Sequence, residues 1–425
     1  MHASRLRTGL TLTAFALSFG VGSLAPALRT NAETTPAPKE PIRYLAFQIF
    51  TPNLDSPEMV ANFPPPRPDF LQRVLDLRDR IGITGSGERQ LGVVLGPLAF
   101  DDTDDDVVKK IDTGFTIARA TGVAIGFHID DSMFWGRVKE LNAPNAIEWL
   151  DWRRTPATGR RLEWGPQATK IRPQLCFNSA EVRQAVADRA KLIGNEVAKG
   201  LQKLGSAHKK LFLGVIAGWE TRIAADFDTG EYPGYCALTN AGYSASRPPA
   251  DIDAARRDIV AGYIAFWAKS LADAGVPKGK IYSHIAFFPE SRYRSWASFV
   301  PYLRSINFTP PSTAFCASCV PGLSVYPEPG LMEQWRDELK KRGNPPWASC
   351  EGAAINPADA AYGRNGGSVE AHLGGLFNNG AILVNLFGWG VGDADNPFRN
   401  AIENSDAIAA YRKFLRGEPL VETRG

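Results

Sequence analysis

Short apolar stretches alternate with longer amphipathic ones along most of the chain. Eight mostly apolar runs, rich in Val, Ile, Leu and Phe, predict short β-strands. They span residues 42–50, 91–98, 123–129, 211–217, 280–286, 322–326, 347–350 and 381–387. Near-continuous apolar character indicates strands that are buried on both faces, as in parallel sheets covered by helices.

Amphipathic helices are predicted between these runs, where apolar residues recur at spacings of three and four with charges between them. The clearest segments are 70–81, 107–120, 180–204, 254–274, 331–342 and 405–415. Gly122, Gly275 and Gly343 stand where a helix commonly ends in a left-handed residue. Eight alternating units predict the α/β class and a single-domain (β/α)8 TIM barrel. A doubly wound open sheet is the alternative, although no Gly-rich phosphate loop follows the first strand.

The first residues have the pattern of an export signal. Arg5 and Arg7 precede an apolar run over 10–24, and small residues follow that run. The run is too short and too rich in Gly and Ser for a membrane span. We therefore expect a signal peptide over 1–27, a flexible tether over 28–41 and a catalytic barrel over 42–420. The mature protein is expected to be secreted or periplasmic, without stable membrane insertion.

Charge bears on the partner. The chain has 48 Lys and Arg against 45 Asp and Glu, and removal of the signal leaves 46 basic residues. A nearly neutral protein without a basic stripe has no electrostatic reason to bind nucleic acid. A neutral substrate is the simpler expectation, and no cofactor is implied.

The five cysteines are an odd set, so at least one has no partner within the chain. Cys316 and Cys319 have CxxC spacing, but no second pair and no flanking His accompany them, which argues against a zinc site. Cys176 and Cys236 are candidates for a bridge between two loops. The sequence does not determine the connectivity.

Two long stretches, 130–178 and 221–250, follow the third and fourth strands and are rich in Trp and Tyr. Barrel enzymes build their sites from loops at the carboxyl ends of the strands. Polar and aromatic side chains at this rim suit a sugar, which needs planar hydrogen-bond partners and flat rings for stacking. The residues expected to bind substrate are His128, Asp130, Asp131, Trp135, Trp219, His284, Tyr326, Asn385 and Trp389.

Two carboxylates, Glu220 and Glu351, directly follow apolar strands. A lone carboxylate there is costly unless it has a partner or a chemical purpose. Glycoside cleavage requires an acid to protonate the leaving oxygen and a carboxylate to meet the oxocarbenium-like centre. On the predicted fourth and seventh strands, these two side chains would face each other across the barrel mouth.

Gly218-Trp219-Glu220 and Cys350-Glu351-Gly352 resemble the two catalytic positions of clan A retaining glycoside hydrolases. The resemblance covers essentially the whole body and implies a (β/α)8 barrel. It also implies that Glu220 is the acid/base and Glu351 the nucleophile, about 5–5.5 Å apart. Trp389 matches a sugar-stacking tryptophan of the clan, and Tyr326 is similar to tyrosines close to the nucleophile. Many members have Asn where this chain has Trp219, so the family within the clan is not identified.

The predicted function is that of an exported glycoside hydrolase acting on an oligosaccharide or polysaccharide. Other functions stay open: an inverting hydrolase or a metal-dependent polysaccharide deacetylase on the same barrel, or a non-catalytic carbohydrate-binding barrel. His128 and Asp130 point to the same side of a strand and could bind a metal, but the five histidines are isolated, so no metal is expected. Structural roles also stay open. Glu220 could form an ion pair with Arg222, and Trp219 and Trp389 could be core residues.

Overall fold

The computed structural model describes residues 41–50, 70–160, 170–287, 289, 309–356, 366–390 and 396–421. The predicted signal peptide and all of the predicted tether except Pro41 lie outside these ranges, so both stay predictions. Among the described residues, no helix is long and apolar enough to cross a membrane. The eight strands and their helices all belong to one unit, Pro41–Gly425.

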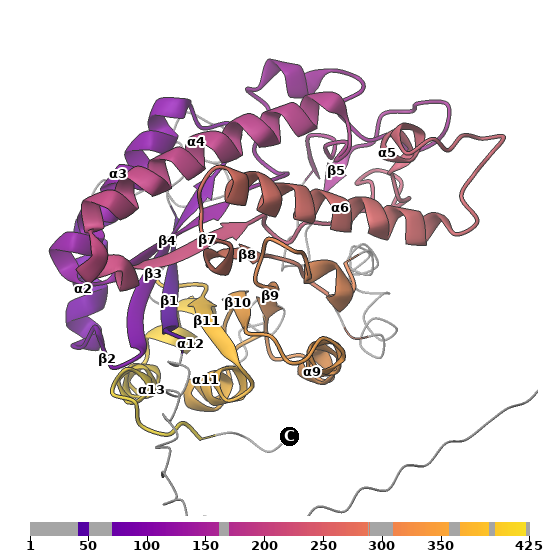
Figure 1. Cartoon of the computed structure of the whole chain (residues 1–425). Helices are drawn as coiled ribbons and strands as arrows, with labels where there is room; N and C mark the ends of the chain where they lie inside the picture. The colour runs from indigo at the N-terminus through magenta and orange to yellow at the C-terminus, as the bar shows by residue number, and fades with distance from the viewer. Residues whose placement is uncertain are drawn as a thin grey trace, which may run out of the picture. The chain divides into compact units, whose positions relative to one another are not determined.

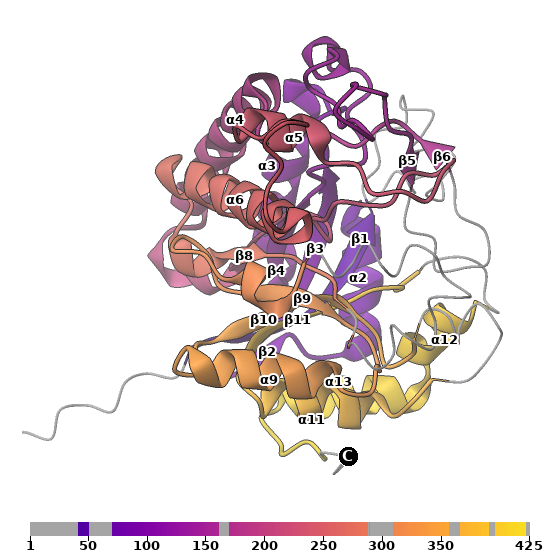
Figure 2. The ribbon, with the colours of Figure 1, turned by 90° about the vertical axis from the view of Figure 1, so that its right-hand side faces the viewer.

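Parallel strands form the centre of this unit (Figures 1 and 2). They are β1 (Arg43–Phe50), β3 (Arg89–Leu98), β4 (Ala124–Ile129), β7 (Phe212–Ala217), β8 (Ile281–Ser283), β9 (Gly322–Val325), β10 (Trp347–Gly352) and β11 (Ala381–Leu386). Their hydrogen-bonded order is β8-β7-β4-β3-β1-β11-β10-β9. Parallel bridges Tyr282–Val320 and Ile285–Leu323 join the two ends of this order and close the barrel. All eight predicted strands are confirmed.

Helices surround the strands. The longer ones are α2 (Phe70–Ile81), α3 (Asp104–Thr121), α4 (Ala180–Leu204), α6 (Ile252–Asp273), α9 (Leu331–Lys341), α11 (Val369–Phe377) and α13 (Ser405–Leu415). The six predicted helices are confirmed, whereas α11 was not predicted. In Figure 2, α9, α11 and α13 cover β9, β10 and β11, while α3, α4 and α6 lie on the other side of the barrel.

Several shorter elements complete the described fold. Gly85–Ser86 (β2) pairs antiparallel with β3, and Gly159–Arg160 (β5) pairs with Lys170–Ile171 (β6). The short helices are α5 (Tyr235–Asn240), α12 (Pro397–Glu403), η1 (Lys139–Asn142), η2 (Ser206–Leu211), η3 (Lys278–Lys280) and η4 (Pro311–Ala314). Of these elements, only β2 pairs with a strand of the barrel.

Local sequence explains the limits of α3. Thr103 caps its first turn in a reciprocal box with Asp106, and Asp104 and Asp105 add acidic charge where the helix dipole favours it. Gly122 ends the helix with a left-handed φ of 72°. Asp104, Asp105 and Asp106 therefore form the first turn of the helix.

Strand alternation sorts side chains between two layers. Leu45, Phe47 and Ile49 of β1 join the large core beneath the helices, whereas Tyr44 and Ala46 join a smaller cluster inside the barrel. The same parity directs Gln48 inward at the carboxyl end of the strand. The barrel interior is thus apolar over most of its depth and becomes polar at its carboxyl end.

The two long loops after β4 and β7 pack against each other. Gln174 of the first loop donates to the Arg222 carbonyl at 2.5 Å and accepts from Ala224 N at 2.8 Å in the second. Thr158 Oγ1 donates to Asp226 at 2.7 Å. These bonds fix the turn that follows β7 against the loop that follows β4.

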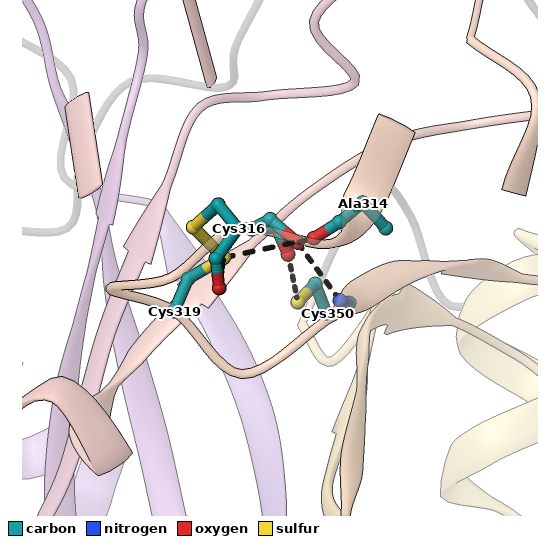
Figure 3. The surroundings of a disulfide bond; sticks show 6 residues. Ala314, Cys316, Cys319 and Cys350 are labelled. Atoms are coloured by element: carbon teal, nitrogen blue, oxygen red, sulfur yellow. Dashed lines mark hydrogen bonds between the residues drawn. A yellow bond between two sulfur atoms is a disulfide. The ribbon is translucent and has the colours of Figure 1, made fainter. Parts of the chain in front are cut away.

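The cysteines differ from the sequence-based expectation. Cys316 and Cys319 form a disulfide in the segment before β9, and the Cys350 thiol donates separately to the Ser283 carbonyl at 3.1 Å (Figure 3). The candidate bridge between Cys176 and Cys236 is not formed, because both are buried free thiols. They pack in one small cluster between the two long loops.

Candidate active site

Glu220 stands on a constrained turn directly after β7. Its φ is 54°, a left-handed value that is uncommon for a residue with a side chain, and such values cluster at functional sites. The buried Asp131 carboxylate stabilises this turn. It accepts from Trp219 N at 3.1 Å and from Thr221 Oγ1 at 2.5 Å. A Cβ at Gly218, where φ is 101°, would lie 2.5 Å from Thr221 Oγ1, so the turn requires glycine there.

Glu351 comes from the end of β10, beside β9. A register shift between Ser349 and Glu351 pairs the latter with Ser324. The Tyr326 hydroxyl donates to Glu351 Oε1 at 2.8 Å. Glu351 thus lies within a strand whose register with β9 fixes its position.

The two carboxylates meet at the end of β9. Ser324 Oγ lies 2.5 Å from Glu220 Oε1, and Tyr326, two residues further along, contacts Glu351. Both glutamates are 3% exposed. Burial and then the negative charge of Glu220 raise the pKa of Glu351, and interactions with Tyr326 and Trp219 oppose that rise. The structure therefore brings together the two carboxylates singled out in the sequence.

Arg222 moderates the charge of Glu220. Its guanidinium lies 3.6 Å from Glu220 Oε2 and donates to the Glu220 backbone carbonyl at 2.9 Å. Burial raises the pKa of Glu220, and the positive charge of Arg222 opposes the rise, as does a hydrogen bond when Ser324 donates it to the ionised carboxylate. The ion pair considered from the sequence is present, and it coexists with the approach to Glu351.

Two buried histidines lie beneath Glu220, inside the barrel. His128 Nδ1 is 3.0 Å from Gln48 Oε1, and its Nε2 is 3.0 Å from His284 Nδ1. His284 Nε2 is 2.8 Å from Ser324 Oγ. Both imidazoles are fully buried, which lowers the pKa of His128 well below its usual value and that of His284 to about 3. Both rings are therefore neutral at physiological pH.

Asn385 continues this polar layer on β11. Its Nδ2 donates to Gln48 Oε1 at 3.0 Å and to the Cys350 backbone carbonyl at 2.8 Å. The contacts of His128, His284 and Asn385 are thus with protein groups. Their predicted contact with substrate stays a prediction.

The remaining predicted residues occupy different places. Asp130 Oδ1 accepts from the backbone amides of residues 132–134, whereas its Oδ2 has no hydrogen-bond partner among the described residues. Trp135 lies 2% exposed in the main core. Trp219 stacks on His128 with ring centroids 4.0 Å apart. Trp389 packs edge-on against Phe47 and remains 7% exposed.

Sequence reasoning missed Ser324 as a site residue. The signal was its position two residues before Tyr326, which places both side chains on the same side of β9. No group of three or more His, Cys, Asp and Glu side chains that could hold a metal occurs in the described part of the chain. His128 and Asp130, considered as metal ligands, therefore lack a described third partner.

No family model matches the sequence, and no curated protein matches it. Among solved structures, the β-amylase catalytic domain of Paenibacillus polymyxa resembles the chain with a TM-score of 0.52 and 7% identity. The likeness shows a shared fold. It covers 89% of this chain and 99% of the β-amylase domain. An endo-1,4-β-D-mannanase from Thermotoga petrophila RKU-1 gives a TM-score of 0.48 and 10% identity over 88% and 99% of the two chains.

Proposed function

We propose that the protein is an exported glycoside hydrolase with a retaining, double-displacement mechanism. The observation that supports this most directly is the convergence of Glu220 and Glu351, both buried, at the end of β9. A pair of carboxylates at the carboxyl rim of a barrel is the equipment that glycosidic bond cleavage needs. The fold likeness to a β-amylase catalytic domain supports the same substrate class.

Each carboxylate has surroundings that suit a different role. Glu351 accepts a hydrogen bond from Tyr326, which stabilises a carboxylate in position to attack an anomeric carbon. Glu220 would protonate the departing oxygen, and then remove a proton from the water that releases the sugar from Glu351. In this scheme Glu220 loses one proton to the leaving group in the first step and regains one from water in the second.

The aromatic residues supply the remaining parts of the proposal. Trp219 and Trp389 retain small exposed fractions at the rim, at 9% and 7%, and we assign them to contact with the sugar ring. Trp219 also interacts with Glu351, so one indole would border both the nucleophile and the sugar. Its presence where many clan A enzymes have Asn implies that the 2-hydroxyl is bound differently.

The test is hydrolysis of a panel of aryl glycosides and of plant and microbial glucans, with the anomer of the first product read by NMR. Retention of configuration on a hydrolysed substrate is the expected result. Inversion would replace the double displacement by direct attack of water between the carboxylates. Binding of glucans without any turnover would indicate a carbohydrate-binding barrel, and release of acetate from acetylated glycans would indicate a deacetylase.

A further inference from the structure

A chain of hydrogen bonds runs through the barrel interior from a backbone carbonyl to Glu220. We call it the polar chain. Its members in order are the Cys350 carbonyl, Asn385, Gln48, His128, His284 and Ser324. Its successive links measure 2.8, 3.0, 3.0, 3.0 and 2.8 Å, and the last, from Ser324 to Glu220, measures 2.5 Å.

The first two links have a fixed direction. A backbone carbonyl only accepts hydrogen bonds, so the Asn385 atom beside the Cys350 carbonyl must be the amide nitrogen. The same nitrogen lies 3.0 Å from Gln48, which must therefore present its oxygen. Turning either amide over would bring two acceptors or two donors together.

The direction of these first bonds determines which nitrogen of each histidine carries the proton. Because Gln48 presents an oxygen, His128 Nδ1 carries a proton, and the neutral ring leaves Nε2 as an acceptor. His284 Nδ1 must then carry the proton between the two rings. The Gly218 carbonyl, an acceptor 3.2 Å from His284 Nδ1 and 3.1 Å from His128 Nε2, shares that proton. The neutral His284 ring in turn leaves Nε2 as an acceptor for the Ser324 hydroxyl.

The last link decides the state of Glu220. A serine hydroxyl has one proton, and here it is committed to His284. Ser324 Oγ can therefore meet Glu220 Oε1 at 2.5 Å only as an acceptor, so the carboxyl oxygen must carry a proton. The other oxygen, Oε2, remains an acceptor towards Arg222.

We propose that the polar chain places the proton shared by the two buried carboxylates on Glu220 and leaves Glu351 ionised. This inference rests on the proposed function and adds a mechanism for the division of roles. If Glu220 lost its proton, Ser324 would have two acceptors and one proton. Either Glu220 Oε1 would face the Ser324 oxygen without a proton between them, or the hydroxyl would turn to Glu220 and His284 Nε2 would lose its donor. The polar chain thus makes Glu220 hold its proton more tightly, and its members act as positioning residues.

The first test needs no activity and uses the unaltered protein. The chain contains five histidines, so their 15N-labelled side chains can be assigned by replacing them one at a time. Long-range 1H–15N NMR spectra at neutral pH should show His128 and His284 both neutral and protonated at Nδ1. A proton on Nε2 of either ring would reverse the direction of the chain and overturn the proposal, whatever the enzyme hydrolyses.

The second test uses turnover. Ser324→Ala removes the acceptor of the Glu220 proton, so the alkaline limb of the kcat/KM profile should move to lower pH by about one unit. Ser324→Thr, which keeps the hydroxyl, should restore it. Ser283→Ala is the matched control, because it removes a buried hydroxyl that donates to the Ala314 carbonyl and accepts from Gly322 N, both outside the polar chain. An alkaline limb that Ser324→Ala leaves in place would overturn the proposal.

The titratable groups around Glu220 define what the profile reports. They are Arg222 on its own turn, His284 on β8, Tyr326 beyond β9 and Glu351 on β10. The neutral histidines do not titrate near neutral pH, and burial raises the pKa of Tyr326 well above its usual value. The alkaline limb therefore reports the proton of the carboxylate pair. Both histidines could prove to be protonated at Nδ1 while Ser324→Ala leaves the alkaline limb unshifted. The polar chain would then be oriented but would not control the proton of Glu220, which also contradicts the proposal.

Discussion

Two regions of the protein bury carboxylates to nearly the same extent, and only one of them has the features of a catalytic site. Glu220 and Glu351, at the barrel rim, are 3% exposed, and Glu148, between the two long loops, is 1% exposed. Burial raises the pKa of all three, that of Glu148 to about 8. The raised pKa alone therefore does not distinguish them.

The neighbours of each carboxylate make the difference. Glu148 Oε2 accepts from the backbone amides of Cys236 and Ala237, at 3.1 and 3.4 Å, at the start of α5. Those donors belong to a loop that Glu148 ties to its own, which is a structural role. Glu220 instead lies near a second carboxylate, that of Glu351. Its own backbone is left-handed, and its side chain contacts the end of the polar chain. Two interacting carboxylates, one of them on a constrained turn, mark a candidate catalytic site better than burial alone does.

Loss of the proposed nucleophile, Glu351, gives the largest expected contrast. Glu351→Gln should reduce turnover about 10⁴-fold or more, because an amide cannot form the glycosyl-enzyme. Glu148→Gln, an equally buried replacement of the same shape, should retain most of the activity. Initial rates on one aryl glycoside, with folding checked by circular dichroism, compare the two. Equal losses in both variants would show that burial, not position, determines sensitivity.

The rate lost when the proposed acid Glu220 is replaced should depend on the leaving group of the substrate. Glu220→Gln should slow hydrolysis of an unactivated glycoside about 10²–10⁴-fold, because no group protonates the departing oxygen. With a dinitrophenyl glycoside the first step needs little protonation, so a burst of phenolate should precede slow turnover. Stopped-flow absorbance measures the burst. The same rate loss on both substrates would contradict the acid role of Glu220.

The fold was largely predictable because each barrel unit carries its own local pattern. All eight strands followed from apolar runs, and α3 followed from its caps and periodicity. Helix α11 escaped because its sequence, VEAHLGGLF, is apolar nearly throughout and includes two adjacent glycines, so no polar face marks a helix. Its tertiary contacts, not its sequence period, make it a helix.

The site was predictable in part. Glu220 and Glu351 were found because a carboxylate after an apolar strand is unusual. His128 and His284 were expected to bind sugar, whereas the structure engages all four ring nitrogens within the protein. Strand parity turns these rings inward, but the partner of each depends on the register between strands, which one sequence does not show. Ser324 was missed for the same reason.

The turn that carries Glu220 depends on a third buried carboxylate, that of Asp131 in the loop after β4. Asp131→Asn replaces an oxygen that accepts from Trp219 N or Thr221 Oγ1 by an amide group that donates. We expect a loss of about 1–3 kcal/mol in the free energy of unfolding, measured with urea. Asp228→Asn, at a half-exposed ion pair with Lys170, should cost clearly less, because solvent screens that pair. A similar cost for both would show that the turn does not depend on Asp131.

The last expected effect concerns the pH dependence of stability at Glu148. Its folded pKa of about 8 exceeds its ordinary value of 4.5, so between these values the folded state holds a proton that the unfolded state releases. Stability contributed by this group therefore falls as pH rises through that window, by about 1.4 kcal/mol per pH unit. Glu148→Gln is neutral at every pH, so the difference in unfolding free energy between variant and parent should grow with that slope from pH 5 to 7. Parallel curves would mean that the backbone amides of α5 keep Glu148 ionised. The contrast with Glu220 and Glu351 would then lie in the ionisation of the carboxylates.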